Sequence, residues 1–555
     1  MGLGNEKFIV NVQSASLDVI WEMSNPNDNL VFENQELSFH FLNKKLSDYL
    51  VHSTKKIEEI LLEKIHLFDY GLIIHKSIEN QEISIYTDLY GITPNYFYIS
   101  DSEIFISNSI DKLASKIKSP SFNIEAIADY FLVNYPIQGR TLLKEVNKMR
   151  GGQKIVVGKE GITVENYLVW NQFENWNLDL SSSIHSTLSN FVSERSDSNQ
   201  NIFLGLSGGF DSKTILAACN SAKIKFKAYT FGEKNNLDVK SAQKTAEILG
   251  IGCECLDFST KNHSDYVEAY HTFLERNENL GFPPTLMNYV FVNNMITNAQ
   301  IFTGKMGGEI IVGPSLISGL VFSNFSNKLL KVHEFEKLKI ILKSFPITNF
   351  LFKEESALDQ YCVKLLEYKF TNKKQNVLLF LLTETYPNFF GQVNNTMTNH
   401  EILNPFLDIR FVQLALKKNI LFSGMNSGVI SRLKARTNYY HWIQSLDSKI
   451  LKTPLDRGFY LNWINPKFLY IIPTLNYIYR KLFISKSKKS TNFLFDFLVN
   501  ESKVFLYQKS QVDVHINGFL ESKKQEFNKK EILNDADKIE LIKLRILEIQ
   551  MMKFQ

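Results

Sequence analysis

The sequence predicts an α/β protein of two parts, a layered N-terminal domain over residues 1–165 and a doubly wound C-terminal domain over residues 175–555. At 555 residues, the chain is too long for one hydrophobic core. Its first part carries short apolar runs separated by turn residues, a pattern typical of antiparallel strands. From about residue 175, apolar runs alternate with helical periodicity, which indicates a parallel sheet covered by helices.

Composition narrows the classes of function. Hydrophobic residues make up 44% of the chain and charged residues 22%, as in ordinary globular proteins. The net charge of +4 argues against nucleic acid as the main partner. The four cysteines indicate no disulfide framework, and Cys253 and Cys255 favour core packing over a metal site. Neither a signal peptide nor a membrane-inserted segment is recognised, so we expect a cytoplasmic enzyme.

The strands expected in the N-terminal part are short and separated by turns. They cover residues 7–12, 37–42, 71–75, 83–86, 96–99 and 153–157. Residues 88–98, D-L-Y-G-I-T-P-N-Y-F-Y, resemble the D-x-x-G-x-x-P-L-Y-Y segment of class II glutamine amidotransferase domains. Residues 105–113 and 140–153 resemble two later segments of that family. The resemblance implies an Ntn-type αββα domain.

The N-terminal part departs from that family at its nucleophile. Working members use an N-terminal cysteine to take ammonia from glutamine, whereas Met1 is followed here by Gly2 and Leu3. The first cysteine of the chain is Cys219, and the family's N-G-E segment is not found. Because this hydrolysis requires a nucleophile, we expect no glutamine hydrolysis. The domain is interpreted as a structural relic or a platform for docking the substrate.

Residues 201–218, N-I-F-L-G-L-S-G-G-F-D-S-K-T-I-L-A-A, predict a buried strand, a glycine turn and a helix. Backbone N–H groups of such a turn and the positive end of the helix dipole both favour an anion. Asp211 adds a carboxylate, which is expected if Mg²⁺ bridges it to the anion. The residues predicted to hold ATP or pyrophosphate here are Leu206, Ser207, Gly208, Gly209, Asp211 and Ser212.

This motif, S-G-G-F-D-S, is neither a Walker loop nor G-x-G-x-x-G. It resembles the signature of the ATP pyrophosphatases, which convert ATP to an acyl-adenylate and pyrophosphate. The resemblance implies ATP and Mg²⁺ as cofactors. The structural alternative is a plain turn between a strand and a helix.

A second strand is expected at residues 226–231, and a helix at 238–249 that ends at Gly250. The resembled family carries the adenine side of its ATP site in this region, which implies a binding role for Phe231. The alternative is that this side chain belongs to the core.

A further loop, residues 303–309, follows an expected strand at 298–302 and reads T-G-K-M-G-G-E. It resembles S-G-x-G-x-D-E of the asparagine synthetase family. The resemblance implies that Thr303 and Gly304 bind ATP and that Glu309 joins Asp211 on Mg²⁺. Lys305 could neutralise departing pyrophosphate. The alternatives are a solvent-exposed loop acid and a solvated surface lysine.

Two later segments also match that family. Residues 401–410, E-I-L-N-P-F-L-D-I-R, resemble G-x-E-x-R-x-P-F-L-D-x-R, in which Asp408 and Arg410 are predicted to cap and pair at a helix start. Glu401 is the candidate for recognising the substrate amine. Residues 452–459, K-T-P-L-D-R-G-F, resemble a K-x-G-F loop that supplies a cation to the oxyanion. Lys452 and Arg457 are both candidates for it, and a structural role is the alternative.

The C-terminal third carries two further patterns. A basic run at 480–489 predicts a solvated face, and apolar spacing over 539–549 predicts a packed amphipathic helix.

Matches from residue 88 to 459 make the chain similar to the asparagine synthetase family, and the missing cysteine makes it similar to the branch of β-lactam synthetases and lasso-peptide macrolactam synthetases. The resemblance implies adenylation of a substrate carboxylate followed by attack of the substrate's own amine. A lasso-peptide cyclase is the first hypothesis. A small-molecule amide, β-lactam or asparagine-synthetase-like ligase and a non-catalytic scaffold are the alternatives. The expected partners are a peptide or small molecule bearing carboxylate and amine, and a precursor-processing protease or leader-binding protein.

Overall fold

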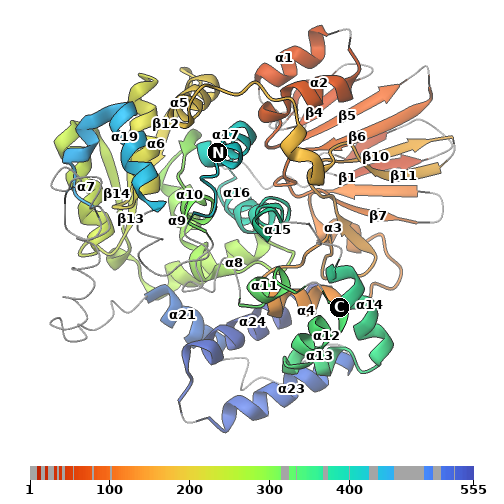
Figure 1. The fold of residues 1–555 in the computed structure, drawn as a ribbon. Helices are drawn as coiled ribbons and strands as arrows, with labels where there is room; N and C mark the ends of the chain where they lie inside the picture. Colours follow the sequence, from red (N-terminus) through yellow and green to blue (C-terminus); the bar gives the residue numbers. More distant parts are fainter. Residues whose placement is uncertain are drawn as a thin grey trace.

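The fold is described from a computed structural model. It describes residues 9–13, 19–22, 30–33, 37–40, 44–53, 55–77, 80–100, 103–159, 161–313, 324–332, 334–366, 373–398, 400–423, 435–455, 460, 493–503, 514–530 and 532–554. Figure 1 shows two antiparallel sheets, in red and orange, on one side of the molecule and a parallel sheet, in yellow and green, on the other. None of the helices within these ranges has the length and apolar character needed to cross a bilayer.

The N-terminal part contains one five-stranded and one six-stranded antiparallel sheet. Across the five-stranded sheet, the strands are β2 (Val19–Glu22), β1 (Ile9–Gln13), β8 (Glu103–Ser107), β7 (Tyr96–Ile99) and β9 (Val146–Lys148). Across the six-stranded sheet, they are β11 (Gly161–Asn166), β10 (Gln153–Gly158), β6 (Glu82–Thr87), β5 (Leu72–Ser77), β4 (Leu37–His40) and β3 (Leu30–Glu33). The six runs predicted to be strands correspond to β1, β4, β5, β6, β7 and β10. The other five strands are three to six residues long and form through pairing with their neighbours.

The two antiparallel sheets pack face to face. Their shared core includes Ile74 and Ile85 from the six-stranded sheet and Ile104 and Ile106 from the five-stranded sheet. Helices α1 (Lys44–His52) and α2 (Ile57–Lys64) lie beside the six-stranded sheet, as Figure 1 shows, and Lys154 on β10 pairs with Glu58 at 2.7 Å. Helix α3 (Ile110–Ala114) packs on β7 and β8. The layered arrangement of sheets and helices follows the prediction.

The third sheet is entirely parallel, in the order β14-β13-β12-β15-β16. Its strands are β12 (Asn201–Gly205), β13 (Lys227–Gly232), β14 (Cys253–Asp257), β15 (Ala299–Phe302) and β16 (His400–Leu403). The chain builds outward from β12 in one direction and then returns to add β15 and β16 on the other side. This order is that of a doubly wound sheet, and the connections diverge at the carboxyl ends of β12 and β15.

The helices of the parallel part begin with α5 (Ile184–Arg195), α6 (Phe210–Ser221) and α7 (Leu237–Leu249). Gly250 ends α7 in the left-handed conformation with φ 67°, as predicted. Helices α8 (His263–Arg276) and α9 (Asn288–Met295) connect β14 to β15. A short helix, α10 (Gly307–Ile311), follows β15.

The remaining helices surround the two parts. They are α4 (Ile124–Val133), α11 (Asn324–Leu329), α12 (Phe335–Lys343), α13 (Pro346–Leu351), α14 (Glu355–Leu366), α15 (Lys373–Phe380), a π-helical stretch (Leu381–Phe390), α16 (Gly391–Thr396), α17 (Ile409–Lys417), α19 (Thr437–Asp447), α21 (Phe493–Ser502), α23 (Val514–Asn528) and α24 (Asp535–Met552). Helix α24 contains the helix predicted at 539–549. The predicted basic face at 480–489 lies outside the described residues.

Buried polar contacts join the antiparallel and parallel parts. Glu278, which follows α8, accepts hydrogen bonds from the Ser109 hydroxyl at 3.1 Å and the Ile110 amide at 2.6 Å, at the start of α3. Arg195 at the end of α5 pairs with Asp69 at 2.8 Å. These contacts cross the boundary between the parts, so they fix the antiparallel sheets against the parallel sheet.

Lys543 on α24 predicts how stability depends on pH. Its buried ammonium donates to the Tyr130 carbonyl at 3.0 Å and the Phe131 carbonyl at 3.1 Å, near the end of α4. Burial lowers its pKa from 10.5 to about 7. Between these values the unfolded chain binds more protons than the folded chain, so this lysine costs stability as pH falls from about 10 to 7.

We therefore expect Lys543→Met to become more stable relative to the wild type as pH falls through this window, and the difference to be constant below it. Urea unfolding at several pH values measures the difference in unfolding free energy. The exposed Lys529→Met variant is the control and should show no such trend. A difference for Lys543→Met that does not vary with pH would contradict the assignment.

Candidate functional site

Two loops leave the parallel sheet at the point where the strand order reverses. The first, residues 206–209, joins β12 to α6, and the Leu206 amide donates to the Tyr229 carbonyl at 2.8 Å. The second, residues 303–306, joins β15 to α10, and the Thr303 amide donates to the Leu403 carbonyl at 2.9 Å. Ligands of doubly wound sheets bind in the crevice at this position.

The first loop is held in shape by a serine. The Ser212 hydroxyl accepts from the Ser207 amide at 3.1 Å and lies 2.9 Å from the Ser207 hydroxyl, which in turn accepts from the Gly209 amide at 3.1 Å. Gly209 precedes α6 with a φ of −80°, which any residue can adopt. A side chain at Gly209 would meet the Ser207 hydroxyl at 3.3 Å, so close packing rather than backbone conformation favours glycine here.

The second loop lies directly on the first turn of α6. A Cβ atom on Gly304 would lie 2.7 Å from the carbonyl carbon of Asp211 and 2.9 Å from the Ser212 amide nitrogen. A Cβ atom on Gly307 would lie 2.7 Å from the Asp211 carboxylate. Glycine is therefore required at both positions by the approach of the two loops. The predicted residues of the two motifs come together at Asp211.

The Asp211 carboxylate sits in an unfavourable electrostatic setting. Burial and, to a smaller extent, the negative charge of Glu309 raise its pKa to about 7. The Tyr439 hydroxyl, the Arg436 guanidinium and the Gly308 amide lie near enough to lower it in part. Two half-buried carboxylates that repel each other suit a divalent cation, since Mg²⁺ takes one or two protein carboxylates and completes its shell with phosphate and water. Within the described ranges, no third acid, histidine or cysteine completes a metal cluster.

Lys305 projects from the second loop against aromatic rings. Its ammonium lies 4.5 Å from the centre of the Tyr289 ring and 5.8 Å from that of Phe389. Burial lowers its pKa to about 8, while the charge of Glu309 opposes this shift. Lys305 is half-buried rather than a freely solvated surface lysine. It brings a positive charge beside the two carboxylates.

The predicted adenine-side residue, Phe231, belongs to the same aromatic group. Its ring packs on Tyr289 with centres 5.6 Å apart and on Phe258 with centres 5.7 Å apart. Phe231 is half-buried at the carboxyl end of β13. The same tyrosine thus contacts both Phe231 and Lys305.

Sequence reasoning missed three residues of this region. Asp238 at the start of α7 is exposed, and it accepts the Gly208 amide at 3.2 Å, an amide predicted to bind phosphate. Tyr439 and Arg436, at the start of α19, lower the pKa of Asp211, although they lie more than 200 residues away in the sequence. An acid early in a helix is an ordinary helix signal, and Tyr439 and Arg436 belong to no matched motif, so the sequence offers nothing that identifies them.

Lys452, one of the two predicted oxyanion cations, lies in a segment that contacts α6 and α7. Lys452 is exposed, and the next residue, Thr453, accepts a hydrogen bond from the buried Lys213 ammonium at 2.8 Å. The Ser241 hydroxyl on α7 donates to the Pro454 carbonyl at 2.5 Å. Arg457 lies outside the described residues. The assignment of either cation to the oxyanion stays a prediction.

The third predicted catalytic residue, Glu401, takes part in a contact within the sheet. Its carboxylate accepts from the Gln300 side chain on β15 at 2.6 Å and pairs with Arg195 at 3.5 Å. These contacts join β16 to β15 and α5. They do not involve the Asp211 or Glu309 carboxylates. A role in amine recognition stays a prediction.

The cap predicted in the 401–410 segment is confirmed. The Asp408 carboxylate accepts the Arg410 amide at 2.8 Å at the start of α17. The Arg410 guanidinium pairs with Asp408 at 2.6 Å and with Glu194 on α5 at 2.8 Å. This segment therefore docks α17 on α5.

Neither a protein-family model nor a curated protein sequence matches the chain. Solved structures match parts of it. A structure of the allosteric regulatory enzyme of purine biosynthesis shares 9% identity over 45% of this chain and 74% of its own, with a TM-score of 0.17. Glutamine phosphoribosylpyrophosphate amidotransferase from B. subtilis, complexed with ADP and GMP, shares 10% identity over 69% of this chain and 93% of its own, with a TM-score of 0.18. At TM-scores this low, neither likeness supports a conclusion about the fold or the function of this chain.

The close approach of Gly307 to Asp211 predicts how an added methyl group at this position changes stability. We expect Gly307→Ala to lower the free energy of unfolding by about 1–3 kcal/mol, because the added carbon meets Asp211 and Phe406 within 3 Å. Chemical denaturation measures the change. Gly252→Ala is the matched control, since its nearest neighbour would lie 4.0 Å away, and it should change stability by less than about 0.5 kcal/mol. Equal effects in the two variants would argue against the close contact.

Proposed function

We propose that the protein is an ATP-dependent, AMP- and pyrophosphate-forming carbon–nitrogen ligase that adenylates a substrate carboxylate and closes an intramolecular amide. The observation that carries this proposal is the packing of Asp211, in the S-G-G-F-D-S motif at the start of α6, against Gly307 and Gly308, in the T-G-K-M-G-G-E motif at the start of α10. This contact brings two motifs, each resembling part of one synthetase site, to the crevice where a doubly wound sheet binds its ligands.

Each group at the crevice has a role under this proposal. The amides of Ser207, Gly208 and Gly209 bind the triphosphate, helped by the dipole of α6. The Ser207 and Gly209 amides now donate to serine hydroxyls of the loop, and phosphate oxygens replace these acceptors. Asp238 now accepts the Gly208 amide, so its carboxylate moves aside when phosphate binds. Asp211 and Glu309 hold Mg²⁺, which when bound neutralises phosphate charge. Phe231 packs at the nucleotide side of the site.

The reaction then proceeds in two displacements. A substrate carboxylate oxygen attacks the α-phosphorus of ATP, the bond from that phosphorus to the bridging oxygen breaks, and pyrophosphate leaves with the bond electrons. The Lys305 ammonium offsets the charge of the leaving group. A substrate amine next attacks the acyl carbon, the carbon–oxygen bond to AMP breaks, and the nitrogen releases a proton. The oxyanion formed in this step calls for a cation, and Lys452 and Arg457 are the candidates.

The amine belongs to the substrate under this proposal. The first cysteine of the chain is Cys219, so the N-terminal part has no cysteine to release ammonia from glutamine. Holding both reacting ends of one molecule in the crevice removes most of the entropic cost of joining them. A lasso-peptide precursor, with a side-chain carboxylate and a free amine, is the substrate we favour. A processing protease or leader-binding protein would then be the partner.

Substrate-dependent exchange of labelled pyrophosphate into ATP tests the first displacement. We expect exchange in the wild type, and a loss of about 10²-fold or more in Asp211→Asn, because the carboxylate that holds the cation is removed. Glu309→Gln should also lose activity. Glu247→Gln, an exposed acid on α7, is the control and should exchange normally. Exchange by Asp211→Asn at the wild-type rate, or none with any candidate acid, would favour the scaffold alternative.

The fate of glutamine tests the N-terminal part. With ATP, Mg²⁺ and glutamine, we expect no glutamate above the background of enzyme-free samples, because the nucleophilic cysteine is missing. A coupled glutamate assay measures this. Release of glutamate in proportion to enzyme would show that this part retains a nucleophile, and the amine could then come from glutamine.

A further inference from the structure

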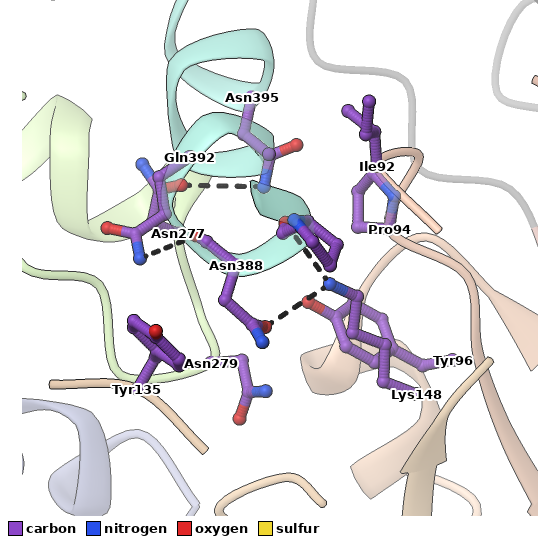
Figure 2. Close-up of a pocket in the computed structure, with 12 residues that line it drawn as sticks. Ile92, Pro94, Tyr96, Tyr135, Lys148, Asn277, Asn279, Asn388, Gln392 and Asn395 are labelled. Atoms are coloured by element: carbon purple, nitrogen blue, oxygen red, sulfur yellow. Dashed lines mark hydrogen bonds between the residues drawn. The ribbon is translucent and has the colours of Figure 1, made fainter. Parts of the chain in front are cut away.

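A second pocket lies at the boundary between the antiparallel part and the helices of the parallel part, and Figure 2 shows it. Its space is about 350 Å³, counting the mouth. It is lined by the turn before β7, by β9, by the segment after α8, and by the π-helical stretch with α16. Tyr135, just after α4, also lines it, so five separate segments of the chain build it. It uses none of the residues assigned to the ATP crevice.

The chemistry of the lining is that of an anion site. Lys148 supplies a positive charge, and no acidic residue is among the described residues that line the pocket. Figure 2 shows the Lys148 ammonium directed at Asn388, with the Tyr96 ring beside it. The carboxamides around them supply donors, since the amide groups of Asn279, Asn388 and Gln392 each use one N–H within the protein.

The Lys148 ammonium has only long hydrogen bonds to the protein. Its ammonium lies 3.4 Å from the Asn388 side-chain oxygen and 3.5 Å from the Pro387 carbonyl. Both distances exceed the 2.7–3.2 Å of an ordinary N–H···O bond. Burial lowers its pKa to about 8, so the charged form still predominates at neutral pH. A half-buried charge with only distant neutral acceptors favours a bound counter-ion.

The acids nearest to the pocket are engaged elsewhere. Glu384 pairs with Arg150 at 3.0 Å and accepts the Gln138 amide at 3.1 Å. Asp88 accepts backbone amides of its own turn, including that of Ile92 at 3.0 Å. Glu278 is occupied by the start of α3. The charges of Glu384 and Asp88 offset only part of the effect of burial on the Lys148 pKa, and the acceptors described for its ammonium are neutral, so a direct ion pair is left to a ligand.

We infer that this pocket binds a small aliphatic monocarboxylate. One ammonium balances one negative charge, which favours a carboxylate over a phosphate dianion. The carboxamide N–H groups and the Tyr96 hydroxyl suit the two oxygens of such a ligand, while Ile92, Pro94 and Pro387 offer a surface for a short apolar chain. The inference is independent of the ligase activity, because it concerns a different part of the molecule.

Binding of propionate by the full-length protein tests the inference. At constant ionic strength set with sodium chloride, we expect propionate to raise the midpoint of thermal unfolding to a saturating value, and titration calorimetry to give one site. Propionamide, which has the same shape without the charge, should give no saturable shift. No saturable effect of propionate, or an equal effect of propionamide, would overturn the inference.

Variants locate the site. Lys148→Met should abolish the saturable shift, whereas Lys144→Met, which removes an exposed lysine four residues away, should leave it unchanged. Asn388→Asp puts a carboxylate beside the Lys148 ammonium and should weaken propionate binding at least tenfold without loss of stability, so the test stands even if Lys148→Met does not fold. Wild-type affinity in Lys148→Met or in Asn388→Asp would overturn the inference.

Discussion

The constraint on which the candidate site depends is the approach of Gly304 and Gly307 to the first turn of α6. Gly304 and Gly307 lie so near Asp211 that a single added carbon at either would fall within 3 Å of it. This contact aligns two chain segments almost 100 residues apart at the carboxyl edge of one sheet. It also places the half-buried Asp211 carboxylate near the charge of Glu309, and burial and this charge both raise the pKa of Asp211. The proposed chemistry depends on this geometry.

The antiparallel part has a structural role that needs no nucleophile. Glu278 binds the start of α3, Arg195 pairs with Asp69, and Arg150 pairs with Glu384. Each of these contacts has at least one buried partner, and together they hold the two parts in one arrangement, so removing the other partner is costly. The Lys148 pocket lies along the same boundary, so a ligand there would stabilise the arrangement in which the parts are joined.

Local patterns in the sequence predicted much of this structure. Alternating apolar runs identified six antiparallel strands, and Gly250 marked the end of α7. What the sequence left out arises from contacts between distant segments. The two glycines of the second loop are explained by Asp211 rather than by a turn, and the setting of Lys305 depends on rings from α9 and the π-helical stretch. Asp238, Arg436 and Tyr439 reach the site only through the fold.

The central claim is that Asp211 and Glu309 share one divalent cation bound to the phosphates of ATP. A crystal of the protein soaked with Mn²⁺ and the non-cleavable analogue α,β-methylene-ATP, with anomalous diffraction collected for manganese, measures this directly. The account predicts an anomalous peak in contact with both carboxylates and with phosphate oxygens, next to the loop of residues 206–209. A nucleotide bound elsewhere, or manganese in contact with neither carboxylate, would contradict it.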